Sequence, residues 1–275
     1  PTAWVIIRVL VESPEDIKTA RELQHGITVT APATHPHTRT ERAGRATTIA
    51  QAGAEYFTEL KRYIELDPPA PWHPSLSPAA QAIVDNPSSV ATKVLAAGVA
   101  EGEQLILRGN GSDAVKRNGW STGRAATGSG DDILKRAVGA KFGLGGHQAI
   151  ENRSYAAQAD AQGSRIDGTK PLTLRFAADN KPPCSAFWSL TAYGPDMYLV
   201  ENAIDRWSIS DRTPDLNYDE DGGLTITLSY EQPTAMTNWL PVPAGPYLLG
   251  LRVYEGHDEV VNCAWFPPTL NPAND

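Results

Sequence analysis

Two Asp-Arg pairs and two serine hydroxyls fall within one stretch of eight residues. The pairs are Asp205-Arg206 and Asp211-Arg212. A carboxylate held by a neighbouring guanidinium can orient a substrate or accept a proton. On this interpretation Asp211 and Asp205 are candidate catalytic residues, and Arg206 and Arg212 are candidate substrate-binding residues. The alternative is architectural, with each Arg binding backbone groups and each Asp capping a turn.

Aromatic residues gather in the same part of the chain. Trp188, Trp239 and Tyr193 are candidate walls of a substrate cleft, because exposed rings beside two acids are typical of sugar-binding sites. The alternative is a tryptophan-rich core. Strand alternation places Phe187 and Trp188 on opposite faces, so we expect one of them to face a groove or a neighbouring domain.

Other kinds of site find little support. His35 and His37 lie in a polar linker without a nearby acid, and the acidic stretch 219–221 lacks the spacing of a calcium loop. The stretch Gly109–Ala114 matches G-x-G-x-x-A, but that motif binds a dinucleotide only within a β-α-β unit, which its surroundings do not predict. We therefore expect no metal and no cofactor. The motifs typical of nucleophilic catalysis are also missing.

The composition excludes several classes of protein. The 275 residues carry a formal net charge of -8, and no basic cluster stands out, so we expect no nucleic-acid partner. No apolar run approaches the roughly 20 residues that a membrane span needs. The two cysteines, Cys184 and Cys263, are either buried free thiols or one disulfide bridge, and the sequence leaves both open.

The start of the chain predicts a strand, a helix and a second strand. Residues 4–11 are apolar enough for a buried strand. Ser13 and Pro14 begin a helix that Gly26 ends, and residues 27–30 return as a strand. Because a strand needs a partner for its backbone hydrogen bonds, we expect an upstream segment or another subunit to supply one.

The middle of the chain predicts helices. Residues 31–45 are a polar linker, and a helical spacing of apolar residues runs from Ile49 to Ile64, where Asp67-Pro68 follows and stops it. The pattern then stays helical in short pieces from 75 to 150, broken by Pro87, Gly98 and Gly102. It includes a helix over Asp131–Leu144.

After about residue 165 the apolar period changes to two. The alternation is clearest over Leu224–Tyr230, directly after a predicted hairpin turn at Asp219–Gly223. Another such strand covers Tyr247–Val253. Successive strands without intervening helices favour an antiparallel sandwich or jelly roll. The fold class is therefore α+β and mainly β, with a jelly-roll-like C-terminus, a helical middle layer and a short β-α-β remnant at the start.

Several blocks of this sequence resemble, in order, an uncharacterised family. The blocks are Pro182–Tyr193, Asn202–Arg212, Asp221–Ile226, Asn238–Gly245 and Trp265–Pro268. Together they resemble domain-of-unknown-function family 1214 over roughly 165–270. Residues 4–32 resemble the last part of family 1254, the domain that precedes it in longer two-domain proteins.

The resemblance implies a jelly-roll-like β-domain after a helical layer, with a truncated β-domain before it. It implies domains at 1–32, the end of the N-terminal β-domain, and at 161–275, the jelly roll, joined by a linker at 33–45 and a helical region at 46–160. Many relatives look exported, which implies a periplasmic or secreted protein, with a cytoplasmic one still open. It implies no settled activity.

Two functions remain open. The first is a hydrolase-type enzyme acting on a small organic or glycan-like substrate in a cleft between the helical layer and the jelly roll. The second is a non-catalytic binding or assembly module that uses the same aromatic face. Expected partners are a small molecule or glycan, together with a missing upstream segment or a second copy of the chain.

Overall fold

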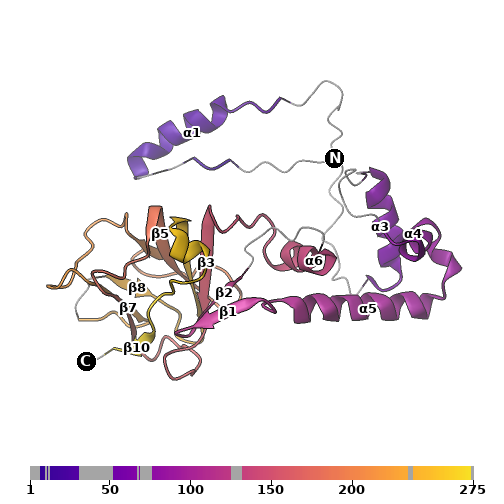
Figure 1. The fold of residues 1–275 in the computed structure, drawn as a ribbon. Helices are drawn as coiled ribbons and strands as arrows, with labels where there is room; N and C mark the ends of the chain where they lie inside the picture. The colour runs from indigo at the N-terminus through magenta and orange to yellow at the C-terminus, as the bar shows by residue number, and fades with distance from the viewer. Residues whose placement is uncertain are drawn as a thin grey trace. The chain divides into compact units, whose positions relative to one another are not determined.

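The structure is a computed structural model that describes residues 7–9, 11, 13–30, 52–66, 68, 76–124, 132–234 and 238–273. The chain divides into two units, Pro1–Gln104 and Leu105–Asp275. The described part of the first unit is helical, and the second holds two β-sheets (Figure 1). The predicted α+β class with a large share of sheet is therefore confirmed.

Helices account for the regular structure described before residue 110. They are η1 (Pro14–Asp16), α1 (Ile17–Gly26), α3 (Glu55–Leu66), α4 (Pro78–Asp85), η2 (Pro87–Ser89) and α5 (Thr92–Gly109). The predicted helix that ends at Gly26 is confirmed, and α3 ends at Leu66, directly before Asp67-Pro68. The hydroxyl of Ser77 caps α4 by accepting a hydrogen bond from the N–H of Ala80 at 3.2 Å.

Three expectations for this region were wrong. Residues 27–30 form no strand, and Ile27 and Val29 are exposed, because the described residues supply no neighbouring strand to pair with them. Gly98 and Gly102 do not interrupt α5, in which Leu95 and Val99 are buried. A helical glycine costs only about 1 kcal/mol, which packing can offset. Half of the predicted strand at 4–11 is described, and these residues, 7–9 and 11, are not in a strand. The other half, together with the predicted linker at 31–45 and its His35 and His37, lies outside the described residues.

The two sheets of the second unit contain the described strands. The strands are β1 (Ala114–Arg117), β2 (Trp120–Gly123), β3 (Asn152–Ala157), β4 (Leu172–Phe176), β5 (Cys184–Tyr193), β6 (Ser208–Ser210), β7 (Leu224–Ser229), β8 (Trp239–Pro241), β9 (Leu248–Gly256) and β10 (Leu270–Pro272). The larger sheet has the order β1-β2-β3-β9-β5-β6 and the smaller sheet β10-β4-β7-β8. All described pairs are antiparallel except β7 with β8, which is parallel and departs from the antiparallel prediction.

The core lies between the two sheets. In β7 the predicted alternation is confirmed, because Leu224, Ile226 and Leu228 are fully buried. They belong to one apolar cluster with residues of the larger sheet, such as Leu190 and Leu251. The predicted turn at 219–223 is also present, and Gly222 has a φ of +79°. It does not close a hairpin, since β6 and β7 belong to different sheets.

A β-hairpin interrupts the region that we predicted to be helical. β1 and β2 are joined by Asn118-Gly119, whose φ angles are +56° and +81°. Asn-Gly is the strongest two-residue signal for such a turn. The Trp120 side chain enters the core, and its indole N–H donates to Pro268 O at 2.8 Å. Burial of this ring fixes the hairpin against the sandwich.

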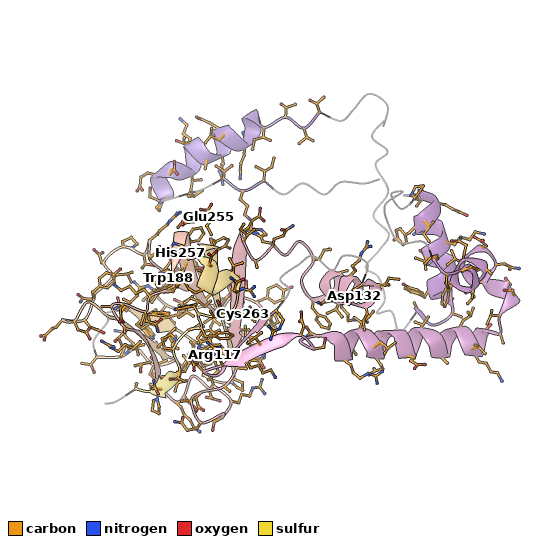
Figure 2. The ribbon with its side chains drawn as sticks, viewed as in Figure 1. Arg117, Asp132, Trp188, Glu255, His257 and Cys263 are labelled. Atoms are coloured by element: carbon orange, nitrogen blue, oxygen red, sulfur yellow. The ribbon has the colours of Figure 1, made fainter. Side chains whose placement is uncertain are left out.

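Two further helices belong to the second unit. The helix α6 (Ile133–Phe142) falls within the predicted range 131–144, and its first turn is capped by Asp132, whose carboxylate accepts from the N–H of Lys135 at 2.9 Å (Figure 2). The short helix α7 (Asp258–Val261) follows β9. No helix in the described ranges is long and apolar enough to span a bilayer.

Candidate functional site

Asp211 and Arg212 lie beside an irregularity in β5. The pairing of β5 with β9 shifts register between Cys184 and Phe187. The carboxylate of Asp211 accepts a hydrogen bond from the backbone N–H of Trp188 at 3.2 Å. The guanidinium of Arg212 lies over the Phe187 ring, 4.4 Å from its centroid, and donates a long 3.4 Å hydrogen bond to Ala186 O. Both charged side chains therefore engage the irregular part of the strand.

The other Asp-Arg pair lies in the loop before β6. Asp205 is exposed at a turn with a φ of +51°, and its N–H donates to Asn202 O. Arg206 Nη1 donates to the backbone oxygen of Trp239 at 3.0 Å, which ties this loop to β8. The side-chain oxygen of Asn202 accepts from the N–H of Arg206 at 2.9 Å. The contacts of Arg206 and Arg212 with backbone oxygens match the architectural alternative for the two arginines, whereas the hydrogen bond of Asp205 is made by its backbone.

The three candidate aromatic walls lie in different surroundings. Trp188 is 4% exposed and packs against Phe176 in the core. Trp239 is equally buried, and its indole N–H donates to Ser229 O at 3.1 Å. Tyr193 is partly exposed beneath the guanidinium of Arg252. A buried indole cannot stack on a ligand from solvent, so the placement of the two tryptophans corrects their predicted role as walls.

The expectation that the two aromatic neighbours in β5 lie on opposite faces is confirmed. Trp188 faces the core, whereas Phe187 lies on the opposite face of the strand, stacked on Tyr254 with ring centroids 4.3 Å apart. The structure thus joins Asp211 to Trp188 and Arg206 to Trp239, but through backbone groups. Catalytic roles for Asp211 and Asp205 stay predictions.

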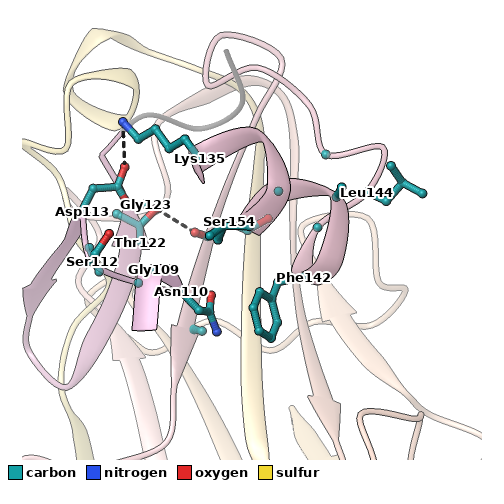
Figure 3. Close-up of a pocket in the computed structure, with 18 of the residues that line it drawn as sticks. Gly109, Asn110, Ser112, Asp113, Thr122, Gly123, Lys135, Phe142, Leu144 and Ser154 are labelled. Atoms are coloured by element: carbon teal, nitrogen blue, oxygen red, sulfur yellow. Dashed lines mark hydrogen bonds and ion pairs between the residues drawn. The ribbon is translucent and has the colours of Figure 1, made fainter. Parts of the chain in front are cut away.

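The second unit contains a cavity between α6 and the outer face of the larger sheet, with a volume of about 610 Å³ (Figure 3). We call it the α6 cavity. Three parts of the chain line it. They are the segment from the end of α5 to the start of β1 (Gly109–Ala114), parts of β2 and β3 (Ser121–Gly123, Ser154 and Ala156), and α6 with the turn that follows it (Lys135, Arg136, Val138–Ala140 and Phe142–Gly146). Its volume is within the range of roughly 300–1,000 Å³ that small-molecule sites occupy.

The sheet supplies a floor of small polar side chains to the α6 cavity. Ser121 and Ala156 face each other across β2 and β3 on the outer face of the sheet. The hydroxyl of Ser121 donates to the backbone oxygen of Ala156 at 3.3 Å, and that of Ser154 donates to Asn152 Oδ1 at 2.9 Å. A second cavity of about 380 Å³ shares Ser121 and Ala156 with the first.

The two ends of the α6 cavity differ in polarity. Asp113 and Lys135 form an ion pair at one end, with 3.6 Å between Oδ2 and Nζ. Phe142 and Leu144 lie toward the other end, and both are exposed apolar side chains (Figure 3). This arrangement, in which apolar surface is combined with a few placed polar groups, is typical of small-molecule sites.

A buried cation lies directly behind the floor. Arg153 is 1% exposed, and its Nη1 donates to the backbone oxygen of Gly123 at 2.6 Å. Its Nη2 donates to Val261 O at 2.7 Å, at the end of α7. The same Nη1 lies 3.3 Å from the hydroxyl of Thr122. Arg153 thereby joins the end of β2 to α7 and holds one edge of the cavity floor in place.

Among the described residues, no group of three or more His, Cys, Asp or Glu side chains is placed to bind a metal ion. Asp219 and Asp221 instead form ion pairs with Arg175. Cys184 and Cys263 are both free thiols, of which Cys263 is buried and Cys184 is partly exposed. Burial, together with the charge of Asp211, raises the pKa of the Cys184 thiol to about 11.

The sequence reasoning missed most residues of the α6 cavity. The sequence of Gly109–Ala114 matches a dinucleotide motif and does not indicate a cavity of this kind. Ser154 and Ala156 lie in β3, inside a range predicted to be helical. This strand has no clear signal in the sequence, because the charged Arg153 lies on its buried face and the apolar Ala156 on its outer face.

A family model supports part of the predicted kinship. The model describes a "Protein of unknown function (DUF1214)". Residues 151–258 match it. The DUF1214 match covers β3 to β9 and supports the resemblance that the C-terminal blocks carry. The resemblance of residues 4–32 to family 1254 stays a prediction. None of the curated proteins matches the chain.

Two solved structures resemble the chain. The VPA0106 protein from Vibrio parahaemolyticus aligns with a TM-score of 0.57 and 20% identity over 95% of this chain and 66% of its own length. An uncharacterized protein from Burkholderia cenocepacia aligns with a TM-score of 0.33 and 15% identity over 81% of this chain and 48% of its own length. This chain thus spans about two thirds of the first structure and about half of the second. The first likeness shows a shared fold.

Proposed function

We propose that this chain is a binding module that holds a small organic ligand in the α6 cavity without turning it over. The observation that carries the proposal is the cavity itself, about 610 Å³ between α6 and the sheet, with the Asp113–Lys135 ion pair near one end and Phe142 near the other. The floor belongs to a sheet whose opposite face is buried, so the cavity is largely preformed.

The hydroxyl groups of the floor support binding over hydrolysis. A serine nucleophile needs an adjacent base that takes its proton. Ser121 and Ser154 instead donate to Ala156 O and to Asn152 Oδ1, respectively. The lining described for the cavity includes neither histidine nor cysteine. A hydrolase site that contains Asp205 and Asp211 remains the second candidate from the sequence.

The proposal also covers the type of β-sandwich, the cellular location and the class of ligand. The two packed sheets support a jelly-roll-like sandwich for the second unit. A periplasmic or secreted location and a glycan-like ligand stay predictions that rest on the resemblance to family 1214.

The test is a thermal-shift screen of small amides, carboxylates, amines, esters and glycosides. A ligand that binds the folded protein stabilises it, by about 2.7 kcal/mol at a hundred times its Kd. Ala156→Leu places a larger side chain on the cavity floor, whereas Ser189→Leu places the same side chain elsewhere on the outer face of the sheet. We expect hits to shift the melting temperature of the wild type and of Ser189→Leu, but not that of Ala156→Leu.

Two results would contradict the proposal. A ligand-induced shift that survives in Ala156→Leu places the binding site outside the cavity. Mass spectrometry of each ligand after incubation should recover it unchanged. A cleaved product that disappears in Asp211→Asn favours the hydrolase instead.

A further inference from the structure

Arg252 lies on the outer face of the larger sheet, in the strand next to the floor of the α6 cavity. Its partner across β9 and β3 is Ser154, which lines the cavity. Cross-strand partners carry their side chains on the same face of a sheet, with Cβ atoms about 5 Å apart. The other partner of Arg252 is Ser189, on the side of β9 away from β3. Arg252 therefore borders the floor along β9.

The guanidinium of Arg252 reaches the strand position opposite the floor residue Ala156. That position is Gly250, which pairs with Ala156 across β9 and β3. A Cβ built on Gly250 would lie 3.4 Å from Nη1 of Arg252 and 3.3 Å from Cε2 of Tyr193. Because Gly250 has no side chain, it leaves room above the strand for the guanidinium and for the Tyr193 ring beneath it. The cation is thereby held beside the cavity floor.

This guanidinium lacks a polar partner within the described part of the chain. Arg252 contacts the ring of Tyr193, 5.5 Å from its centroid, but it forms no hydrogen bond or ion pair with any residue that the structure describes. The side chain is partly exposed, so a ligand can reach it. A cation that has lost part of its hydration gains more from an opposite charge than a fully solvated one does. Arg252 is therefore suited to bind an anion.

The other charges around the floor also favour an anion. Lys135 and Arg136 line the cavity together with one acid, Asp113. Lys135 pairs with Asp113, and Arg136 also interacts within the protein, so we assign neither cation to the ligand. Arg153, behind the floor, donates to backbone oxygens and to the Thr122 hydroxyl. Cations thus exceed acids around the floor, and their summed field attracts a negatively charged ligand.

The rest of the cavity fits an apolar body. Phe142 and Leu144 lie toward the end remote from the Asp113–Lys135 ion pair (Figure 3), and Val138 lines the cavity from α6. An aromatic or aliphatic group placed here is removed from water against these side chains. Its burial stabilises the complex by about 25 cal/mol per Å² of apolar surface.

We propose that the α6 cavity binds an amphipathic monocarboxylate, whose apolar body lies in the cavity and whose carboxylate accepts hydrogen bonds from Arg252 at the β9 side of the floor. The planar guanidinium matches a carboxylate with two parallel N–H donors, and one such group balances one negative charge. This inference rests on the proposed binding function and adds the chemical class of the ligand. It assigns Arg252 as the residue that recognises the charged group.

Three probes with one apolar body and different head groups test the inference. They are 4-phenylbutanoate, 4-phenylbutanamide and 4-phenylbutylamine, the last being a cation at pH 7. Their Kd values for the full chain are measured by titration calorimetry or ligand-observed NMR. We expect the carboxylate to bind about tenfold tighter than the amide and the amine to bind weakest. Ala156→Leu should weaken all three probes, because it fills the floor.

Variants of Arg252 separate its charge from its packing. Arg252→Met keeps a long side chain but removes the charge, so the Kd of the carboxylate should rise about tenfold while that of the amide stays the same. Arg252→Lys keeps the charge and should retain part of the preference. Arg165→Met removes an exposed arginine elsewhere and should leave the preference unchanged. A purely structural role for Arg252 would weaken all three probes alike. That result, or a carboxylate preference that survives in Arg252→Met, overturns the inference.

The failure of the inference is distinguishable from that of the binding function. If the amide or the amine binds the wild type tightest and Ala156→Leu abolishes its binding, the ligand class is wrong but the cavity is still a binding site. If none of the three probes binds, the ligand class is also wrong, and the thermal-shift screen decides the binding function. If binding occurs and is unchanged in Ala156→Leu, both proposals fail.

Discussion

The carboxylate of Asp211 accepts a hydrogen bond from the backbone N–H of Trp188 at 3.2 Å, next to the register shift in β5. Arg212 covers the outward ring of Phe187 from the same short segment. The Asp211 carboxylate therefore accepts a backbone hydrogen bond of the irregular strand, and the Arg212 guanidinium packs on one of its rings. Asp211, a catalytic candidate, and Arg212, a substrate-binding candidate, thus both have structural contacts that explain their presence.

Two substitutions of Asp211 separate its structural role from a catalytic one. Asp211→Ala leaves the Trp188 N–H without its partner and should lower the free energy of unfolding by about 1 kcal/mol. Asp211→Asn keeps an accepting oxygen at the same position and should stay close to the wild type. Urea denaturation measures both. Equal stability of all three proteins, with a loss of turnover in both variants, would favour the catalytic interpretation.

The buried guanidinium of Arg153 should contribute strongly to stability. Arg153→Met keeps the length of the side chain but leaves the backbone oxygens of Gly123 and Val261 without their donors. We expect a loss of about 3 kcal/mol in the free energy of unfolding. Arg165 is exposed, so Arg165→Met is a matched control that should change stability by no more than about 0.5 kcal/mol. Similar losses in both variants would argue against the role of Arg153.

Two glycines should respond oppositely to substitution by alanine. A Cβ on Gly168 would overlap Pro243 O and lie 2.7 Å from Val242 Cγ2, so Gly168→Ala should destabilise the fold by about 2 kcal/mol. A Cβ on Gly98 meets nothing within 4 Å, and alanine is the better helix former. Gly98→Ala should therefore stabilise α5 by up to about 1 kcal/mol. Calorimetric melting temperatures that move in the same direction would contradict this assignment.

The turn before β7 should make stability depend on pH. A hydrogen bond from the N–H of Gly223 and the guanidinium of Arg175 hold the pKa of Asp221 below its usual range. A carboxyl whose pKa is lower in the folded than in the unfolded state stabilises the fold above about pH 4. That stability disappears as the pH falls through the folded-state pKa.

Asp221→Asn removes this dependence. The difference in unfolding free energy between wild type and variant should be largest above about pH 4 and should shrink as the solution becomes more acidic. Urea denaturation at a series of pH values measures the difference. Glu220→Gln, at the exposed neighbouring position, is the matched control. A difference that stays constant from neutral to acid pH would contradict the role of Asp221.

The sequence predicted local structure best where the signal is contained in a few neighbouring residues. The helix that ends at Gly26, the end of α3 before Asp67-Pro68 and the alternation of Leu224, Ile226 and Leu228 were all confirmed. The first two signals depend on the backbone conformations that glycine and proline favour, and the third on the alternation of side chains between the two faces of a strand. The hairpin at Asn118-Gly119 was missed although its turn signal is equally local, because it lies inside the range 75–150 that was predicted to be helical.

By itself the sequence determined an α+β chain with a β-rich second half, because apolar period and turn residues act over short distances. Only the tertiary structure decided that Trp188 and Trp239 are buried and that Asp211 bonds to a strand backbone. It also brought Asp113, Lys135 and Ser154 to one cavity. The physical reason is that burial and cavities depend on how separate layers pack, and a linear pattern does not specify which distant residues meet.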